Sequence, residues 1–334
     1  MGAWGIKALE RDEGLDVLDI LKNEYVPEHP VMDLGEMIEL MKEEVMLGSD
    51  FSQIDFLFDN TAMALAELYF QWKDTMGLDI YAGTLTRYYS HNWKTVVQQW
   101  AEENGYSFNR ITPDGEPADN EEEMSPAEVQ AAVENWRDQI LSAISQPGQP
   151  PYAPWLEDNE KPYYTDKPDW DAFGAMLLVA ACRTYEEPVP STVEKDWIFG
   201  EHPLVARLAS DEERVWSLFR GATWWLPLSD SFLFQGSLPT DDTAAIATLG
   251  GLRKELEKLN QLAWQADEDT ILGWADTEGY PVDGTVDSDG QYSKADIPEH
   301  TQYDTQSLAK FAFSMFWRAM RFAEEQQVPI LLDY

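Results

Sequence analysis

Acidic side chains close to tryptophan are the residues of this chain best suited to catalysis. Glycoside hydrolysis needs two carboxyl groups, and aromatic rings serve as platforms for sugars. A carbohydrate-active hydrolase is therefore one functional hypothesis. The competing interpretation is that these tryptophans are core residues, since large aromatic side chains are commonly buried. The positions concerned are Trp224, Trp225, Asp230, Trp274, Asp276 and Glu278.

The acidic turn at residues 283–290 is the nearest approach to a metal site. Its sequence, Asp-Gly-Thr-Val-Asp-Ser-Asp-Gly, looks like part of a calcium loop, which alternates oxygen ligands before a glycine. Thr285 stands where the first aspartate belongs, and Asp296 stands where a bidentate glutamate is usual. The histidines have no helical spacing for shared coordination. We therefore expect an ordinary acidic turn, no metal and no cofactor.

Nucleophilic catalysis has little support in the sequence. Cys182, the single cysteine, ends the apolar run that starts at Leu177. It cannot form an intramolecular disulfide, which fits a reducing compartment, and we expect it to be buried and unreactive. The sequence has no Gly-x-Ser-x-Gly motif, Walker loop or Gly-x-Gly-x-x-Gly motif, so we predict no catalytic residue. It also has no secretory signal and no apolar run of about 18 residues, which favours the cytoplasm.

The charge of the chain limits the class of partner. Its 334 residues include 62 Asp plus Glu and 23 Lys plus Arg, for a formal net charge of −39. Residues 1–145 carry 29 acidic and 9 basic side chains, and the remainder carries 33 and 14, so the two parts have charges of −20 and −19. Such a surface repels nucleic-acid phosphates and anionic lipid, so we expect neither nucleic acid nor a membrane as a direct partner.

Apolar residues spaced three and four apart predict helices over most of the chain. Ser125-Pro126-Ala127-Glu128 is a capping box with proline at the first helical position, and Asp304 is a plausible cap for the C-terminal helix. The predicted helices are 12–24, 33–47, 51–72, 91–104, 125–144, 169–184, 211–222, 252–262 and 304–323.

Strand patterns are few and lie in the C-terminal half. Residues 231–235 and 243–248 flank a turn-forming segment and predict a hairpin, and residues 328–332 predict an edge strand, where Pro329 is tolerated. The predicted fold class is mainly α (α+β), with helical bundle-like packing and a small antiparallel β element in the C-terminal half.

A proline-rich stretch divides the chain. Residues 146–168 contain six prolines, which remove backbone donors and exclude an ordinary helix. We therefore predict a helical N-terminal domain over residues 1–145 and a connector over 146–168. Residues 169–334 form a mainly helical C-terminal domain that contains the hairpin.

The N-terminus begins Met1-Gly2-Ala3-Trp4-Gly5 and continues into the acidic segment Glu10–Asp16. This start resembles an uncharacterised bacterial family, domain of unknown function 4259, whose members begin Met-Gly-x-Trp-Gly. The helix at residues 51–72 looks like the family's later alanine-rich helix, so the resemblance covers about the first quarter of the chain. The resemblance implies no catalytic residues.

These observations favour an acidic, non-enzymatic protein that binds a basic protein, such as an immunity protein or an inhibitor of a nucleic-acid enzyme. Complementary charge accelerates association, and such a surface needs aromatic anchors but no catalytic motif. The alternatives are the hydrolase and a housekeeping protein whose charge serves solubility. The sequence does not specify the oligomeric state. The predicted partner-binding residues are Asp119, Glu121, Glu122, Glu123, Trp224 and Trp225.

Overall fold

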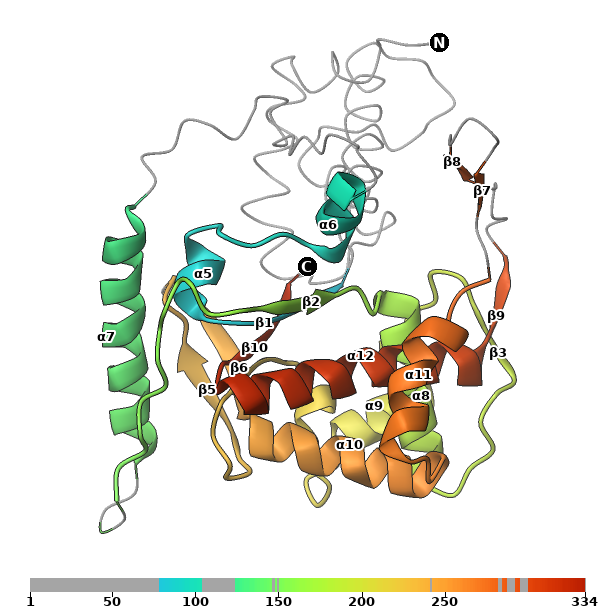
Figure 1. The fold of residues 1–334 in the computed structure, drawn as a ribbon. Coiled ribbons are helices and arrows are strands. Elements are labelled where there is room, and N and C mark those ends of the chain that lie inside the picture. The colour runs from blue at the N-terminus through green and yellow to red at the C-terminus, as the bar shows by residue number, and fades with distance from the viewer. Residues whose placement is uncertain are drawn as a thin grey trace, which may run out of the picture. The chain divides into compact units, whose positions relative to one another are not determined.

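A mixed six-stranded sheet forms the centre of the described part of the protein (Figure 1). The computed structural model describes residues 78–103, 124–145, 148, 150–240, 242–281, 284–286, 292–294 and 300–333. All of these belong to one compact unit, Leu78–Asn109 with Asn120–Tyr334. The strand order is β2-β1-β10-β4-β6-β5. The strands are β1 (Asp79–Ala82), β2 (Tyr164–Asp166), β4 (Ala222–Leu226), β5 (Leu233–Ser237), β6 (Thr243–Thr248) and β10 (Ile330–Asp333).

The prediction of a bundle-like, mainly α fold with one small β element is therefore wrong. Neighbouring strands are antiparallel except for β4 and β6, which run parallel. Strands β1, β2 and β4 escaped sequence reasoning because each contains only three to five residues. Strands β1, β4 and β10 are largely buried, so they lack the alternation of apolar and polar residues that marks a half-exposed strand.

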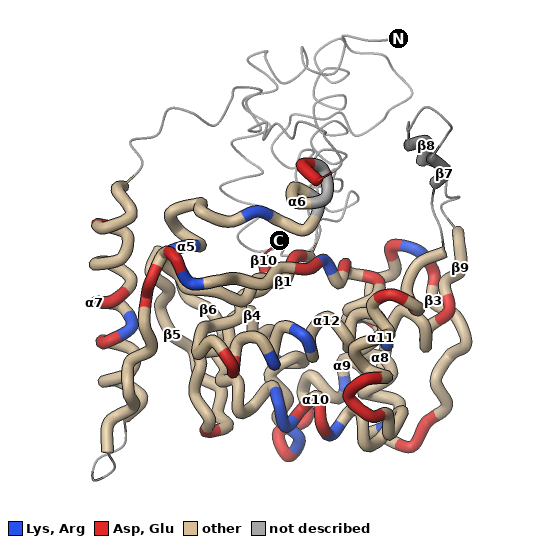
Figure 2. The backbone as a smooth tube through the Cα atoms, viewed as in Figure 1, with Lys and Arg blue, Asp and Glu red and all other residues tan. Residues whose placement is uncertain are grey.

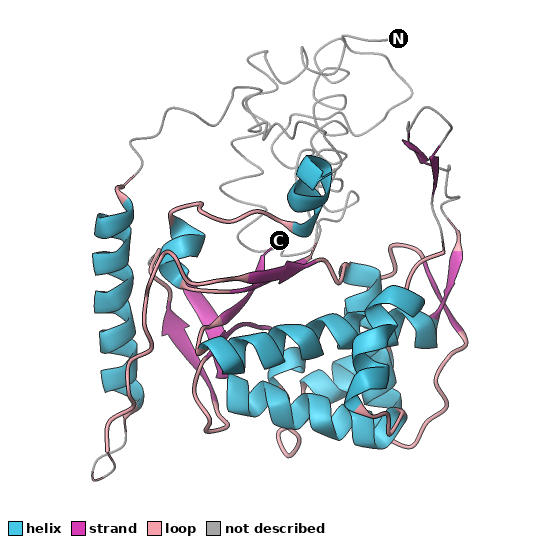
Figure 3. Cartoon of the chain, in the orientation of Figure 1, coloured by secondary structure: helices cyan, strands magenta, loops and turns pink. Residues whose placement is uncertain are grey.

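Helices cover the sheet and account for most of the core (Figure 3). Helix α12 packs against α8 and α11. The described residues also form two shorter sheets, each of two antiparallel strands: β3 (Thr192–Glu194) with β9 (Gln302–Asp304), and β7 (Gly284–Val286) with β8 (Tyr292–Lys294). The helices are α5 (Leu85–Tyr89), α6 (Val96–Glu103), α7 (Pro126–Ile144), α8 (Trp170–Thr184), α9 (Pro203–Ala209), α10 (Leu249–Ala263), α11 (Glu268–Thr277) and α12 (Thr305–Gln326), with 3-10 helices at Phe199–Glu201 and Ser217–Phe219.

Successive residues of the central strands belong to two separate core clusters, because strand side chains alternate between the faces of a sheet. Ile80 and Trp225 join the cluster that contains α8, α10 and α12. Tyr81 and Trp224 join the other cluster, with side chains from α5 and α7. The sheet therefore separates two apolar layers.

Several helix predictions are confirmed where the local cap is strong. The amide of Ser125 donates to Glu128 Oε2 at 2.9 Å, which completes the predicted capping box of α7. Asp304 caps α12 by accepting from the Ser307 amide at 2.7 Å. Helices α8 and α10 match the predictions at 169–184 and 252–262, whereas α6 begins only at Val96. The helices predicted at 12–24, 33–47 and 51–72 lie outside the described residues.

The helix predicted at 211–222 is wrong. Asp211 instead accepts the amides of Glu213 and Arg214 at 3.0 and 3.1 Å and forms a turn. The chain then passes through the 3-10 helix Ser217–Phe219 into β4. Tertiary burial of Trp216 and its neighbours, and not a continuous helical stripe, explains the apolar pattern of this segment.

The predicted hairpin exists as β5 and β6, which pair antiparallel at one edge of the sheet. The predicted C-terminal edge strand lies instead between β1 and β4. Leu331 is opposite Tyr81 on one side and Trp224 on the other. Pro329 is tolerated because it precedes β10, and its carbonyl accepts from the Gly83 amide at 3.2 Å.

The proline-rich segment is anchored by a buried carboxylate. Glu157 is 2% exposed and accepts from the Thr86 amide at 2.9 Å and from Trp155 Nε1 at 2.7 Å. Arg137 donates to the Trp155 carbonyl at 2.6 Å. Strand β2, which lies in this segment, pairs with β1. The predicted domain division at 146–168 also involves residues 1–77, which lie outside the described residues, so it stays a prediction.

Candidate functional site

Five aspartates lie where three strands and one helix meet, a region that we call the acidic end of the sheet. Strand β1 starts here, β2 and β10 finish here, and α8 begins nearby. Asp79 is directly opposite Asp333 in the β1–β10 register, and Asp166 is opposite the residue that follows Asp79. Figure 2 shows acidic positions in red near the C-terminus and along the adjoining strands. The acidic end consists of Asp79, Asp166, Asp169, Asp171 and Asp333.

Asp79 has the least satisfied carboxyl group of the acidic end. Its Oδ1 atom is buried and has no hydrogen-bond partner within the described residues. Burial raises the pKa of Asp79 to about 6, against an ordinary value of 3.8. Lys167 lowers this pKa, whereas Asp333, Asp169 and Asp166 raise it. A cation brought close to Asp79 would relieve both the desolvation and the repulsion.

Asp171 has a similar electrostatic environment on the first turn of α8. It is 8% exposed, and its Oδ2 atom accepts from the Asp196 amide at 3.1 Å. Burial raises its pKa to about 6, and the negative charges of Asp196 and Asp169 contribute in the same direction. Asp79 and Asp171, both at the acidic end of the sheet, therefore each have a raised pKa.

Backbone strain accompanies this charge. Asp169 caps α8 by accepting from the Trp170 amide at 2.8 Å, yet its φ of 59° and ψ of 157° are conformations that favour glycine. Asp196 also has a positive φ, 59°. The fold thus holds two aspartates in strained backbone positions close to Asp171.

Tyrosine hydroxyl groups donate hydrogen bonds to two of these aspartates. Tyr88 donates to Asp333 Oδ1 at 2.8 Å, and Tyr164 donates to Asp166 Oδ2 at 2.7 Å. A neutral hydroxyl group satisfies one carboxylate oxygen but contributes no positive charge. The acidic end can therefore attract lysine or arginine side chains.

A metal centre is not supported in the described part of the chain. Among those residues, no group of three or more His, Cys, Asp or Glu side chains is arranged to hold a metal ion. The calcium-like turn has its aspartates at 283, 287 and 289, all outside the described residues. The idea of an ordinary acidic turn there stays a prediction.

The two tryptophans predicted to contact a partner are core residues. Trp224 and Trp225 lie in β4 and are 5% and 0% exposed. Trp225 Nε1 donates to Ser217 Oγ at 2.9 Å, while the Trp224 ring packs 5.6 Å from the Trp136 ring. Their burial corrects the prediction and also removes them as sugar platforms. Asp119, Glu121, Glu122 and Glu123 lie outside the described residues.

The other tryptophan named for the hydrolase hypothesis is also buried. Trp274 is 7% exposed and packs 5.2 Å from the Trp264 ring. Its acidic neighbours are engaged in ion pairs: Asp276 with Arg318 at 3.1 Å and Glu278 with Lys310 at 2.7 Å. Asp230, on another part of the fold, accepts from Tyr152 at 2.8 Å. These residues do not form one catalytic site.

Sequence reasoning missed the acidic end because its members are separated by up to 254 positions, from Asp79 to Asp333. The one local signal is that Asp79 and Asp333 each border a short apolar run, Ile80–Ala82 and Ile330–Leu332. Only strand pairing places those two borders opposite one another.

The predicted burial of Cys182 is confirmed, since its side chain is fully buried in α8, and this burial raises the thiol pKa. Within the described residues, no helix is both long enough and apolar enough to cross a membrane.

No protein-family model, curated protein or solved structure matches this chain.

Proposed function

We propose that this protein is an acidic, non-enzymatic binding protein for a basic protein, and that the acidic end of the sheet is a contact surface. The observation that carries the proposal is Asp79. Its buried oxygen lacks a donor in the described structure, and three further aspartates raise its pKa. Lys167 partly offsets these charges by lowering that pKa.

A partner's lysine or arginine is the chemistry that fits this surface. Its charge would offset the repulsion at Asp79, and its N–H groups would donate to the partly exposed carboxylates of Asp166 and Asp169. The net charge of −39 supports the same class of partner, because long-range attraction raises the association rate. An immunity protein or an inhibitor of a nucleic-acid enzyme is the form of this function that we favour. The buried single cysteine supports a cytoplasmic location.

Calorimetry with a ten-residue lysine peptide tests the surface. The double variant Asp79→Asn/Asp166→Asn removes two charges from the acidic end. We expect it to weaken binding about fivefold in 50 mM salt, and the loss should shrink as salt rises. The matched control is Glu212→Gln/Glu213→Gln, which removes two charges from exposed positions elsewhere. Equal losses in both variants would show that the general field, and not the acidic end, attracts the peptide.

The glutamates at 121–123 provide a separate test, which asks whether their charge accelerates association with a basic partner. Changing all three to glutamine should slow association with a basic protein recovered by pull-down, without changing the melting temperature. The rate difference should disappear at high salt because charges beyond about 8 Å are screened at physiological salt. An unchanged rate would remove these three glutamates from the contact, and the absence of any basic partner would count against the proposed function.

A further inference from the structure

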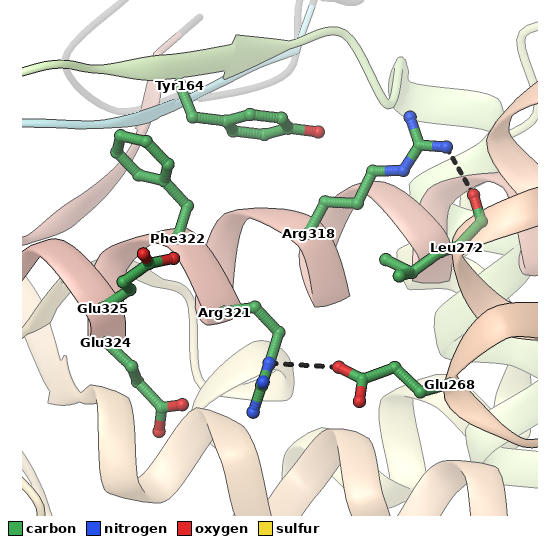
Figure 4. Close-up of a pocket in the computed structure, with 8 residues that line it drawn as sticks. All are labelled: Tyr164, Glu268, Leu272, Arg318, Arg321, Phe322, Glu324 and Glu325. Atoms are coloured by element: carbon green, nitrogen blue, oxygen red, sulfur yellow. Dashed lines mark hydrogen bonds and ion pairs between the residues drawn. The ribbon is translucent and has the colours of Figure 1, made fainter.

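A groove of about 630 Å³ lies over the exposed face of α12 (Figure 4). Four of its residues, Arg318, Arg321, Phe322 and Glu325, are spaced as one helical face requires. Helix α11 and strand β2 contribute the other walls. This volume is in the range of sites that hold small organic ligands, about 300–1,000 Å³. The lining residues are Tyr164, Glu268, Leu272, Arg318, Arg321, Phe322, Glu324 and Glu325.

Arginines and carboxylates both line the groove. Arg321 Nε contacts Glu268 at 3.1 Å, and Arg318 donates to Asp276 at 3.1 Å and to the Leu272 carbonyl. Glu324 pairs with Arg253. The groove therefore presents both signs of charge within a short distance.

Two charged side chains in the groove have atoms that can still bind a ligand. Within the described structure, Arg321 uses only its Nε, and its side chain is 52% exposed. Glu325 is exposed and makes no hydrogen bond or ion pair with any described residue. Figure 4 shows the Glu325 carboxylate on the Phe322 side of the groove, whereas Arg321 extends toward Glu268. One donor group and one acceptor group thus remain available on opposite sides.

An apolar surface lies beside these charges. The Tyr164 and Phe322 rings are 6.1 Å apart, and Leu272 faces them across the groove in Figure 4. Aromatic and aliphatic walls of this kind bind an apolar ligand body, while a few polar groups fix its orientation.

We infer that this groove binds a dipeptide-sized zwitterion with an aromatic side chain. Arg321 binds its carboxylate, Glu325 binds its ammonium group, and the rings of Tyr164 and Phe322 contact the aromatic side chain. The net charge of −39 disfavours binding of a free anion, and the arginines of the groove disfavour binding of a simple cation. A zwitterion has no net charge, so neither repulsion opposes its binding.

Arg321 and Glu325 lie four residues apart on α12 and are therefore neighbours on the helix surface. An extended dipeptide spans up to about 7 Å between its two charged ends, which gives it one charge for each of these side chains.

The experiment measures binding of phenylalanyl-glycine, whose ring is next to its ammonium group, by calorimetry, alongside three blocked forms: acetylated, amidated, and both. We expect the free dipeptide to bind and each blocked form to bind at least about tenfold more weakly. Arg321→Gln should remove the preference for a free carboxylate, and Glu325→Gln should remove the preference for a free amine. Arg183→Gln, at an exposed position at the end of α8, is the matched control and should change nothing.

Three results would overturn the inference: no binding at millimolar dipeptide, equal binding of all four forms, or tightest binding of the acetylated anion. The melting temperature of each variant checks that it is folded. Because this ligand is small and the groove variants leave the acidic end unchanged, failure here is distinct from failure of the proposed function.

Discussion

The junction around Glu157 and the acidic end of the sheet both bury carboxyl groups, but they satisfy them differently. Glu157 receives the Thr86 amide and the Trp155 indole, and Arg137 lies close enough to lower its pKa, although burial still raises it overall. Asp79 has a buried oxygen without a donor and faces other aspartates. A buried carboxylate stabilises the fold when hydrogen-bond donors surround it, as they do at Glu157. Where such donors are missing, as at Asp79, the negative charge remains available to attract a partner.

The largest expected effect concerns the satisfied carboxylate. Glu157→Ala should lower the free energy of unfolding by about 3 kcal/mol, because it leaves buried donors without an acceptor. Glu157→Gln keeps one acceptor oxygen, so we expect about half that loss. Urea unfolding measures both. Glu160→Ala, at a nearby exposed position, should have little effect, and a Glu157→Ala protein as stable as the parent would refute the anchoring role.

An opposite effect is expected at the acidic end. Asp79→Asn should raise the free energy of unfolding at pH 7 by about 1 kcal/mol, a value reduced for the partial exposure of this group. The pKa of Asp79 is about 6 when folded and lower when unfolded, so the folded state binds more protons between pH 4 and pH 6. The contribution of Asp79 to stability therefore falls as pH rises through this window.

Denaturation as a function of pH distinguishes this account from a simple packing change. The gain from Asp79→Asn should be present above pH 6 and nearly absent at about pH 3, below both the folded and the unfolded pKa, where the parent carboxyl group is largely protonated in both states. A gain of the same size at both pH values would contradict the electrostatic explanation.

The smallest effect is expected for Lys167, which opposes the repulsion at the acidic end. Lys167→Gln should lower the free energy of unfolding at pH 7 by about 0.5 kcal/mol, since half-exposed charges interact weakly. The loss should decrease in the Asp79→Asn background, because the main interacting charge is then gone. A double-mutant cycle measures this coupling, and additive losses would show that the two groups act independently.

The sequence by itself determined the elements that depend on local chemistry. The capping box at Ser125, the Asp304 cap and the hairpin around residues 233–248 each need only neighbouring residues, and all three are present. The same local reasoning identified Cys182 as a core residue.

Only the tertiary structure decided the sheet order and the candidate site. Strand β10 has four residues, too few to reveal by periodicity which strands it will join, and it pairs with partners from both halves of the chain. That pairing, together with β2, places Asp79, Asp166 and Asp333 at one end of the sheet. The same tertiary packing buries Trp224 and Trp225, whose exposure depends on side chains distant in sequence.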